Sequence, residues 1–117
     1  MDVHDLVEAV VEGDLIAARQ WVADARRQPL NWSMVPCPSD FAGLKMTVAA
    51  ALVELLARRA GETAPSWTDA VGGEHEPVVL DPGLEGMPRS FARAKSSAPE
   101  PLRKRNLYAL PDFLDVA

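Results

Sequence analysis

The chain has 117 residues and a formal net charge of −5, which suits one small domain with a modest core. Cys37 is the only cysteine, and His4 and His75 are the only histidines, so we expect neither an internal disulfide nor a structural metal. The first residues lack a basic and hydrophobic leader, and the most apolar run, 48–57, is too short to cross a membrane. We therefore expect a cytoplasmic protein that makes no membrane contact.

The first two predicted helices form a hairpin. Apolar residues at i, i+3, i+4 and i+7 predict an amphipathic helix that begins after Asp2 and stops at Gly13; they are Val3, Leu6, Val7 and Val10. Asp14 is placed to cap a second helix. The apolar stripe of that helix consists of Leu15, Ala18, Val22 and Ala25. The short connection at Gly13 and Asp14 predicts that the two helices are antiparallel.

A proline-rich loop then leads to the longest predicted helix. Trp32 is expected to anchor this loop on the core, because the loop is too apolar to lie in solvent. Ser39 or Asp40 is expected to cap a helix from Phe41 to Ala60, which Gly61 ends. This helix is apolar on most sides, which predicts a central position, covered by other helices or by a partner.

Short elements are expected beyond Gly61, because seven of the ten prolines lie after Ala64. The capping-box pattern at 66–69 predicts a helix of one or two turns. Residues 76–80 are expected to form a short extended segment. Prolines also indicate small helices over Ser97–Arg105 and Pro111–Val116. The predicted fold is mostly α, a helical hairpin plus a long central helix, with short helices and turns in the C-terminal third. We expect one domain over 1–117, with a helical body (1–61) and a Pro-rich wrapping or docking segment (62–117).

Catalytic chemistry has no clear motif in this sequence. Cys37 lies between two prolines, but neither histidine stands in a motif relation to it. Pairs of carboxylates such as Glu8 and Glu12 fit the solvent face of a helix, and no glycine-rich phosphate loop is present. We therefore expect no catalytic residues, no cofactor and no enzymatic activity.

The C-terminal segment is the strongest candidate for binding a partner. Residues 1–85 carry 6 basic and 14 acidic residues, whereas 86–117 carry 6 basic and 3 acidic ones. Arginine, tyrosine and phenylalanine are residue types favoured at interfaces, and Lys104 lies between two such arginines. The predicted partner contacts are Arg103, Lys104, Arg105, Tyr108 and Phe113. The alternative is that the segment packs on its own body, with Leu102, Leu107, Leu110, Phe113 and Leu114 completing the core.

Two other functions stay open. Phe91, Arg93 and Lys95, together with the basic run 103–105, interleave aromatic and basic groups as nucleic-acid-binding surfaces do, which allows a small transcriptional regulator. The negative charge of the whole chain disfavours this function, and the stretch between the second and third helices is too long for a helix-turn-helix. The other alternative is a structural helical domain without a binding role.

Several short stretches resemble a group of small uncharacterised bacterial proteins that are commonly suspected to be antitoxins. These stretches are Val53-Glu54-Leu55-Leu56-Ala57, Pro65-Ser66-Trp67-Thr68, Pro101-Leu102-Arg103-Lys104-Arg105-Asn106-Leu107 and Pro111-Asp112-Phe113-Leu114. The resemblance covers the last two thirds of the chain and brings no catalytic residue with it. It implies a protein that neutralises a cognate toxin by direct binding, with the segment 103–105 entering a cleft of that toxin.

Overall fold

Helices dominate the structure, and the longest of them lies at its centre. The computed structural model describes residues 2–28, 30–81 and 87–115. Its elements in chain order are α1 (Val3–Glu12), α2 (Leu15–Arg27), the 3₁₀ helix η1 (Trp32–Met34), α3 (Leu44–Arg59), the 3₁₀ helix η2 (Ser66–Ala70), β1 (Val78–Val79), α4 (Pro88–Ser97), α5 (Glu100–Arg103) and β2 (Leu107–Tyr108). The predicted mostly α fold class is confirmed. None of the helices in the described ranges is long and apolar enough to span a membrane.

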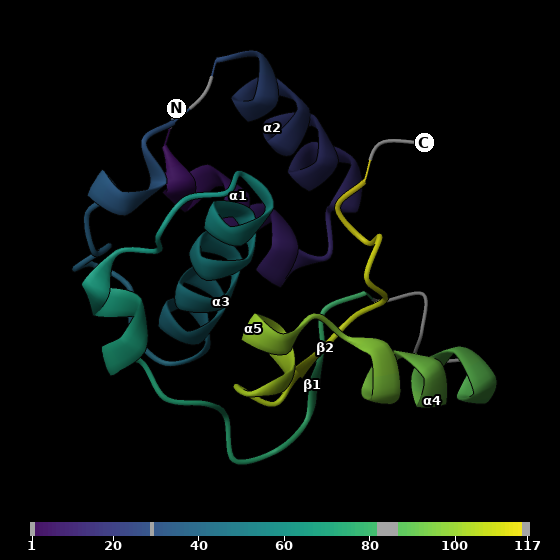
Figure 1. The fold of residues 1–117 in the computed structure, drawn as a ribbon. Helices are drawn as coiled ribbons and strands as arrows, with labels where there is room; N and C mark the ends of the chain where they lie inside the picture. Colours follow the sequence, from purple (N-terminus) through teal and green to yellow (C-terminus); the bar gives the residue numbers. More distant parts are fainter. Residues whose placement is uncertain (1, 29, 82–86, 116–117) are drawn as a thin grey trace.

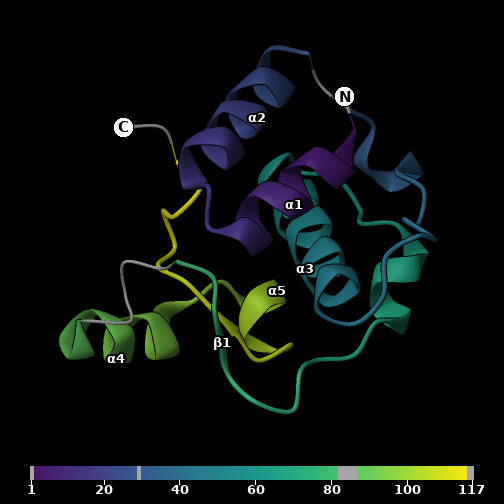
Figure 2. The same cartoon turned by 180° about the vertical axis from the view of Figure 1, so that it is seen from behind.

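The predicted hairpin of α1 and α2 is confirmed down to its caps. The Asp2 carboxylate accepts a hydrogen bond from the His4 backbone N–H, and Gly13 ends α1 in the left-handed conformation, with φ of 79°. The Asp14 carboxylate accepts the Ala17 N–H at 3.1 Å and starts α2. The two helices pack on each other, and α1 also crosses α3 (Figure 2).

The central helix α3 begins later than predicted. The expected start at Phe41 is wrong, because residues 38–41 form a turn in which the Phe41 N–H donates to the Pro38 carbonyl at 3.0 Å. Gly43 follows with φ of 59° and ψ of −134°, a conformation that is strained for any residue with a Cβ, and the helix starts after it. The predicted stop is correct to within one residue, since Gly61 ends the helix with φ of 73°.

The central position of α3 is confirmed by its burial. All eleven residues from Thr47 to Ala57 are buried, although one of them is Glu54. Contacts with α1, η1, η2 and α5 enclose the helix on several sides (Figure 1). Trp32 of η1 is buried as predicted, so it anchors the loop between α2 and α3. Pro29, which belongs to that loop, lies outside the described residues.

The short elements after Gly61 differ from the predictions in several details. No capping box forms at 66–69: η2 is a 3₁₀ helix, its N-cap is Pro65, and the Thr68 hydroxyl donates to the Pro65 carbonyl. The helix expected over 97–105 is confined to α5, because Ala98, which precedes Pro99, is extended with ψ of 142°. Residues 111–114 form turns instead of a helix, and Val116 lies outside the described residues.

Helix α4 and the strand β2 are additions that the sequence did not predict. The predicted extended piece at 76–80 contains β1, and its partner is β2, with Val78 opposite Leu107 and Val79 opposite Tyr108 in parallel register. The ladder includes the bond from the Val78 N–H to the Asn106 carbonyl, at 3.0 Å. A parallel pair joins segments far apart in the sequence, which local pattern does not reveal.

Gly73 provides a test of the contact between the segment before β1 and the turn before β2. The Glu74 N–H donates to the Arg105 carbonyl at 3.0 Å, and a Cβ on Gly73 would lie 2.8 Å from the Arg105 Cα. We expect Gly73→Ala to lower the free energy of unfolding by about 1 to 3 kcal/mol, because two backbone segments must separate. Urea unfolding measures the effect.

Gly72→Ala is the matched control for this substitution. A Cβ on Gly72 meets no atom within 4 Å, and Gly72 is not in the left-handed region. Its effect should stay within about 0.5 kcal/mol. Equal stability of the two variants would contradict the close approach at Gly73.

Candidate functional site

The five predicted contact residues do not form one surface. Arg103 is exposed, and the Lys104 side chain is 37% exposed. Tyr108 is half-buried, whereas Arg105 and Phe113 are each only 2% exposed. Leu102, Leu107 and Leu114 are fully buried and belong to the core with Phe113, so the alternative in which the segment packs on its own body describes this structure. Leu110 is the exception among its predicted core residues, because it is only half-buried. Arg105 and Phe113 are therefore not accessible to a partner in this fold.

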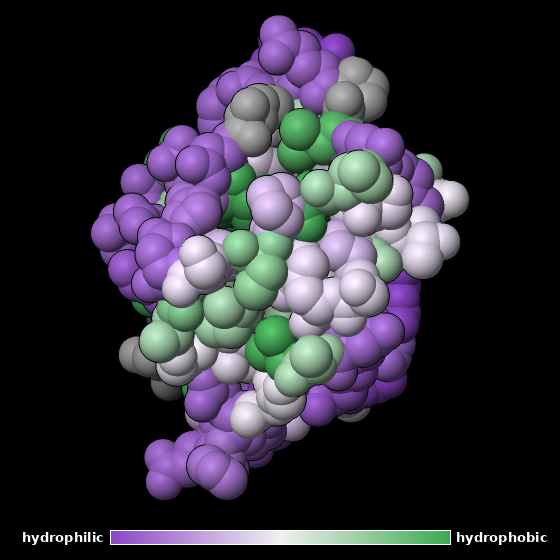
Figure 3. Space-filling view, turned by 90° about the vertical axis from the view of Figure 1, so that its left-hand side faces the viewer, coloured by the Kyte–Doolittle hydropathy of each residue, from purple (hydrophilic) through white to green (hydrophobic). Residues whose placement is uncertain are grey.

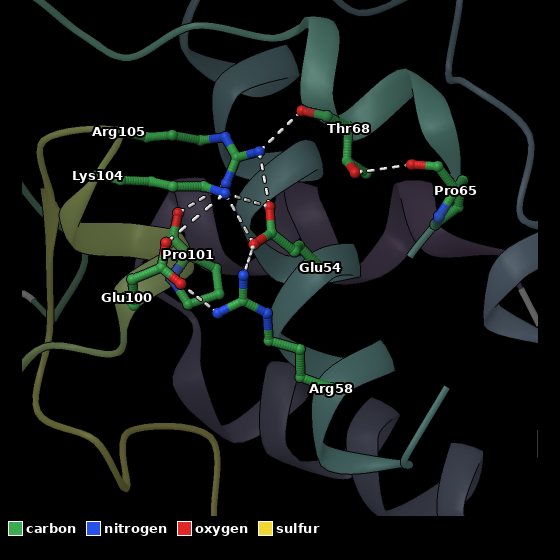
Figure 4. A network of polar contacts seen from close by, with 8 residues as sticks. All are labelled: Glu54, Arg58, Pro65, Thr68, Glu100, Pro101, Lys104 and Arg105. Carbon is green, nitrogen blue, oxygen red and sulfur yellow. Dashed lines mark hydrogen bonds and ion pairs between the residues drawn. The ribbon is translucent and has the colours of Figure 1, made fainter. Parts of the chain in front are cut away.

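Glu54 of α3 forms an ion cluster with Lys104 and Arg105, two of the three residues of the basic run 103–105 (Figure 4). Its side chain is 4% exposed and contacts Arg105 Nη2 at 3.0 Å, Lys104 Nζ at 2.8 Å and Arg58 Nη2 at 2.7 Å. Glu100 of α5 pairs with Arg58 and, at 3.8 Å, with Lys104. Two of the three predicted basic contacts are thus held by carboxylates of the same chain.

Arg105 connects three segments from a buried position. Besides Glu54 of α3, its guanidinium donates to the Thr68 carbonyl of η2 and to the Pro101 carbonyl of α5, each at 2.8 Å. A buried cation needs such partners, because the loss of hydration costs several kcal/mol. One guanidinium atom, Nε, is buried without a hydrogen-bond partner in the part of the chain that the structure describes. Arg105 therefore joins the C-terminal segment to the central helix.

The electrostatics of the cluster follow from this geometry. Burial alone would raise the pKa of Glu54, but hydrogen bonds from Lys104 and Arg105 outweigh it and lower the pKa overall. The hydrogen bond from Arg58 lowers the pKa of Glu100. Both carboxylates are therefore charged near neutral pH. The signal in the sequence was Glu54 itself, the one charge within the apolar run 48–57, which requires a buried cation.

Arg105 and its neighbour Arg103 form a matched pair for testing this role. Arg105→Ala leaves Glu54 with one cation fewer and removes one hydrogen bond from each of two buried carbonyls, so we expect the free energy of unfolding to fall by about 3 to 5 kcal/mol. Arg103 is exposed, and its one hydrogen-bond acceptor among the described residues is the Ser96 carbonyl, at 3.3 Å. Arg103→Ala should change stability by less than about 0.5 kcal/mol in the same urea titration. Equal losses would show that Arg105 is not a buried clamp.

His4 forms a second polar link, between the start of α1 and the turn before α3. Its Nδ1 lies 2.6 Å from Asp2 Oδ1, and its Nε2 lies 2.6 Å from Asp40 Oδ1. The hydrogen bonds to Asp40 and Asp2 raise the pKa of His4. The ring also contacts Phe41, with 4.6 Å between the ring centroids. A protonated His4 therefore holds two segments together.

This link predicts that stability depends on pH. Because the folded pKa of His4 lies above the unfolded value of 6.5, the stabilisation is complete below pH 6.5 and is lost as pH rises through the folded pKa. The pKa values of Asp2 and Asp40 are lowered from 3.8, so their contributions change only in acid. We expect urea midpoints to fall as pH rises above 6.5. His4→Gln should remove this decline, and an unchanged decline would contradict the role of His4.

A groove of about 560 Å³ lies beside His4, between the start of α1 and the loop 30–38. Its lining includes Leu30, Met34 and Val35, and Met34 is 73% exposed. Figure 3 shows the side of the molecule formed by the η1 and η2 segments, where an apolar to neutral area lies between hydrophilic margins. We call this feature the η1 groove.

Cys37 also lines the η1 groove, but it is not paired with a base. Its sulfur makes no hydrogen bond with a described residue, and both ring nitrogens of His4 contact carboxylates. Neither ring nitrogen of His4 is thus free to accept the thiol proton. Among the residues that the structure describes, no group of three or more His, Cys, Asp and Glu side chains is placed to hold a metal ion.

Comparison with known proteins adds no family to this picture. No protein-family model, curated protein or solved structure matches the chain. The antitoxin-like resemblance of the last two thirds therefore stays a prediction. Function is therefore inferred from the side chains that the fold leaves exposed.

Proposed function

We propose that this protein is a non-enzymatic interaction module that binds a partner protein through the η1 groove. The observation that carries the proposal is Met34, a large apolar side chain that is 73% exposed at the groove while its neighbour Trp32 is buried. Methionine adapts its shape to different apolar surfaces and is favoured at protein interfaces. Binding a partner would remove this apolar surface from water.

The groove is supported by hydrogen bonds that hold its loop before any partner arrives. Glu62 accepts the Trp32 backbone N–H at 3.1 Å, and the Trp67 indole donates to the Val35 carbonyl at 2.8 Å. The loop is thus tied to the residues after α3 and to η2 on the two sides of Met34. A loop that is ordered in advance loses less conformational entropy on binding.

The finer form of the proposal is an antitoxin that neutralises a cognate toxin by direct contact. Its support is the resemblance described above, together with an apolar groove that offers a surface for another protein. Of the predicted contacts, Arg103, Lys104 and Tyr108 keep exposed or half-exposed side chains, so they are the remaining candidates to reach the toxin. Arg105 and Phe113 serve the fold instead.

Affinity capture from a lysate of the encoding organism, followed by mass spectrometry, tests the groove. We expect the tagged wild-type protein to retain a stoichiometric partner and Met34→Asp to retain at least about tenfold less, because a charge would be buried against apolar surface. Ile16→Asp is the control, since Ile16 is an 82% exposed apolar residue on α2 that does not line the groove.

The outcomes separate the coarse proposal from the finer one. Equal capture by Met34→Asp and wild type would show that the groove is not the binding surface. A captured partner that arrests growth when expressed alone, and not when expressed with this protein, would support the antitoxin role. A captured partner without such toxicity would leave an interaction module of another kind.

A further inference from the structure

The cations of this protein fall into two groups according to their partners. Seven of the twelve Lys and Arg residues pair with carboxylates: Arg26, Arg27, Lys45, Arg58, Arg59, Lys104 and Arg105. Arg19 donates instead to the Phe113 carbonyl. The remaining four pair with no carboxylate among the described residues, and all four are exposed and lie on α4 or α5: Arg89, Arg93, Lys95 and Arg103.

Helix α4 presents these cations away from the body. It projects from the rest of the molecule in both ribbon views (Figures 1 and 2), and Ala94 is its only buried residue. Arg89 and Arg93 are one turn apart, which places their Cα atoms about 6 Å apart on one face. Arg103 of α5 extends the row, because its guanidinium donates to the Ser96 carbonyl near the end of α4.

The aromatic side chain of α4 lies on the other side of the helix from Arg89 and Arg93. Met87, just before α4, is 54% exposed, and Phe91 is half-buried. Lys95 Nζ lies 4.8 Å from the centroid of the Phe91 ring, so this cation covers an aromatic face. Phe91 and Lys95 stand two residues from Arg89 and Arg93, about 160° around the helix, so they do not share a face with these arginines. The α4 surface is therefore defined by cations alone: Arg89, Arg93 and Arg103.

We propose that the α4 surface binds an acidic segment of a partner protein, in which several carboxylates lie close together. The inference rests on the proposed function as a protein-binding module and adds a second surface with its own chemistry. Exposed cations that pair with no carboxylate among the described residues, in a chain with net charge −5, favour an anionic partner. A long nucleic acid is disfavoured, because the acidic body would repel its other phosphates.

Fluorescence anisotropy with the full-length protein tests this inference. The probe is a short labelled peptide in which most residues are Glu, and a second peptide with Gln in place of Glu reports contacts that do not need charge. A labelled single-stranded oligonucleotide and a DNA duplex probe the nucleic-acid alternative. Each is titrated at low and at physiological salt, since contacts between exposed charges weaken with screening.

We expect the wild-type protein to bind the acidic peptide more tightly than the Gln peptide and either nucleic acid. The double variant Arg89→Gln with Arg93→Gln should bind the acidic peptide about tenfold more weakly, through two lost charge contacts. Arg26→Gln with Arg27→Gln removes the same net charge from α2, and its affinity should stay within about twofold of wild type.

Four results would overturn the inference. They are no binding of the acidic peptide, equal losses in the two double variants, tighter binding of an oligonucleotide, or self-association that Arg89→Gln with Arg93→Gln abolishes. The two proposals fail separately: capture that still depends on Met34 without peptide binding overturns the α4 surface alone. Peptide binding that depends on Arg89 and Arg93, without capture through Met34, overturns the η1 groove alone.

Discussion

The ion cluster around Glu54 is the interaction on which the rest of the structure depends. Glu54 lies in the buried stretch of α3, where a lone carboxylate would lose its hydration without compensation. Arg105, Lys104 and Arg58 supply three positive charges to it. Because one of these cations comes from α3 itself and two from the C-terminal segment, the charge of Glu54 determines where that segment packs.

This constraint divides the C-terminal segment into a structural part and an exposed part. Beyond Lys104 and Arg105, the apolar side chains of Leu102, Leu107 and Phe113 join the core, and β2 pairs with β1. Helix α4 keeps only Ala94 buried, and its basic side chains are exposed and pair with no carboxylate among the described residues. Surface charge that does not support the fold is free to serve binding.

Local signals in the sequence were sufficient where the physics is local. Asp2, Gly13, Asp14 and Gly61 were predicted as helix ends from their conformational and hydrogen-bonding preferences, and the structure uses each of them in that way. The start of α3 was misplaced because Gly43 interrupts an apolar stretch with a backbone conformation that residue type alone does not reveal. Helix α4 was missed, since three of its ten residues are serines, which have low helix propensity.

The candidate site shows the same division. From Trp32, the sequence predicted that the loop before α3 is anchored, but not that Met34 and Cys37 line a groove with His4. The choice of Arg103, Lys104, Arg105, Tyr108 and Phe113 as contacts treated five neighbours in the sequence as neighbours on a surface. The structure instead separates Arg105 and Phe113 from the exposed Arg103, because burial depends on contacts with distant residues.

By itself, the sequence determined the helical class, the hairpin and the central position of α3, because caps and apolar periodicity act over one or two helical turns. Only the tertiary structure decided which charges are internal and which are exposed. Arg103 and Arg105 are two residues apart and chemically identical, yet one guanidinium faces solvent and the other lies against Glu54 and Thr68. That difference arises from long-range packing, since a buried cation is stable only where distant segments bring a carboxylate and carbonyls to it.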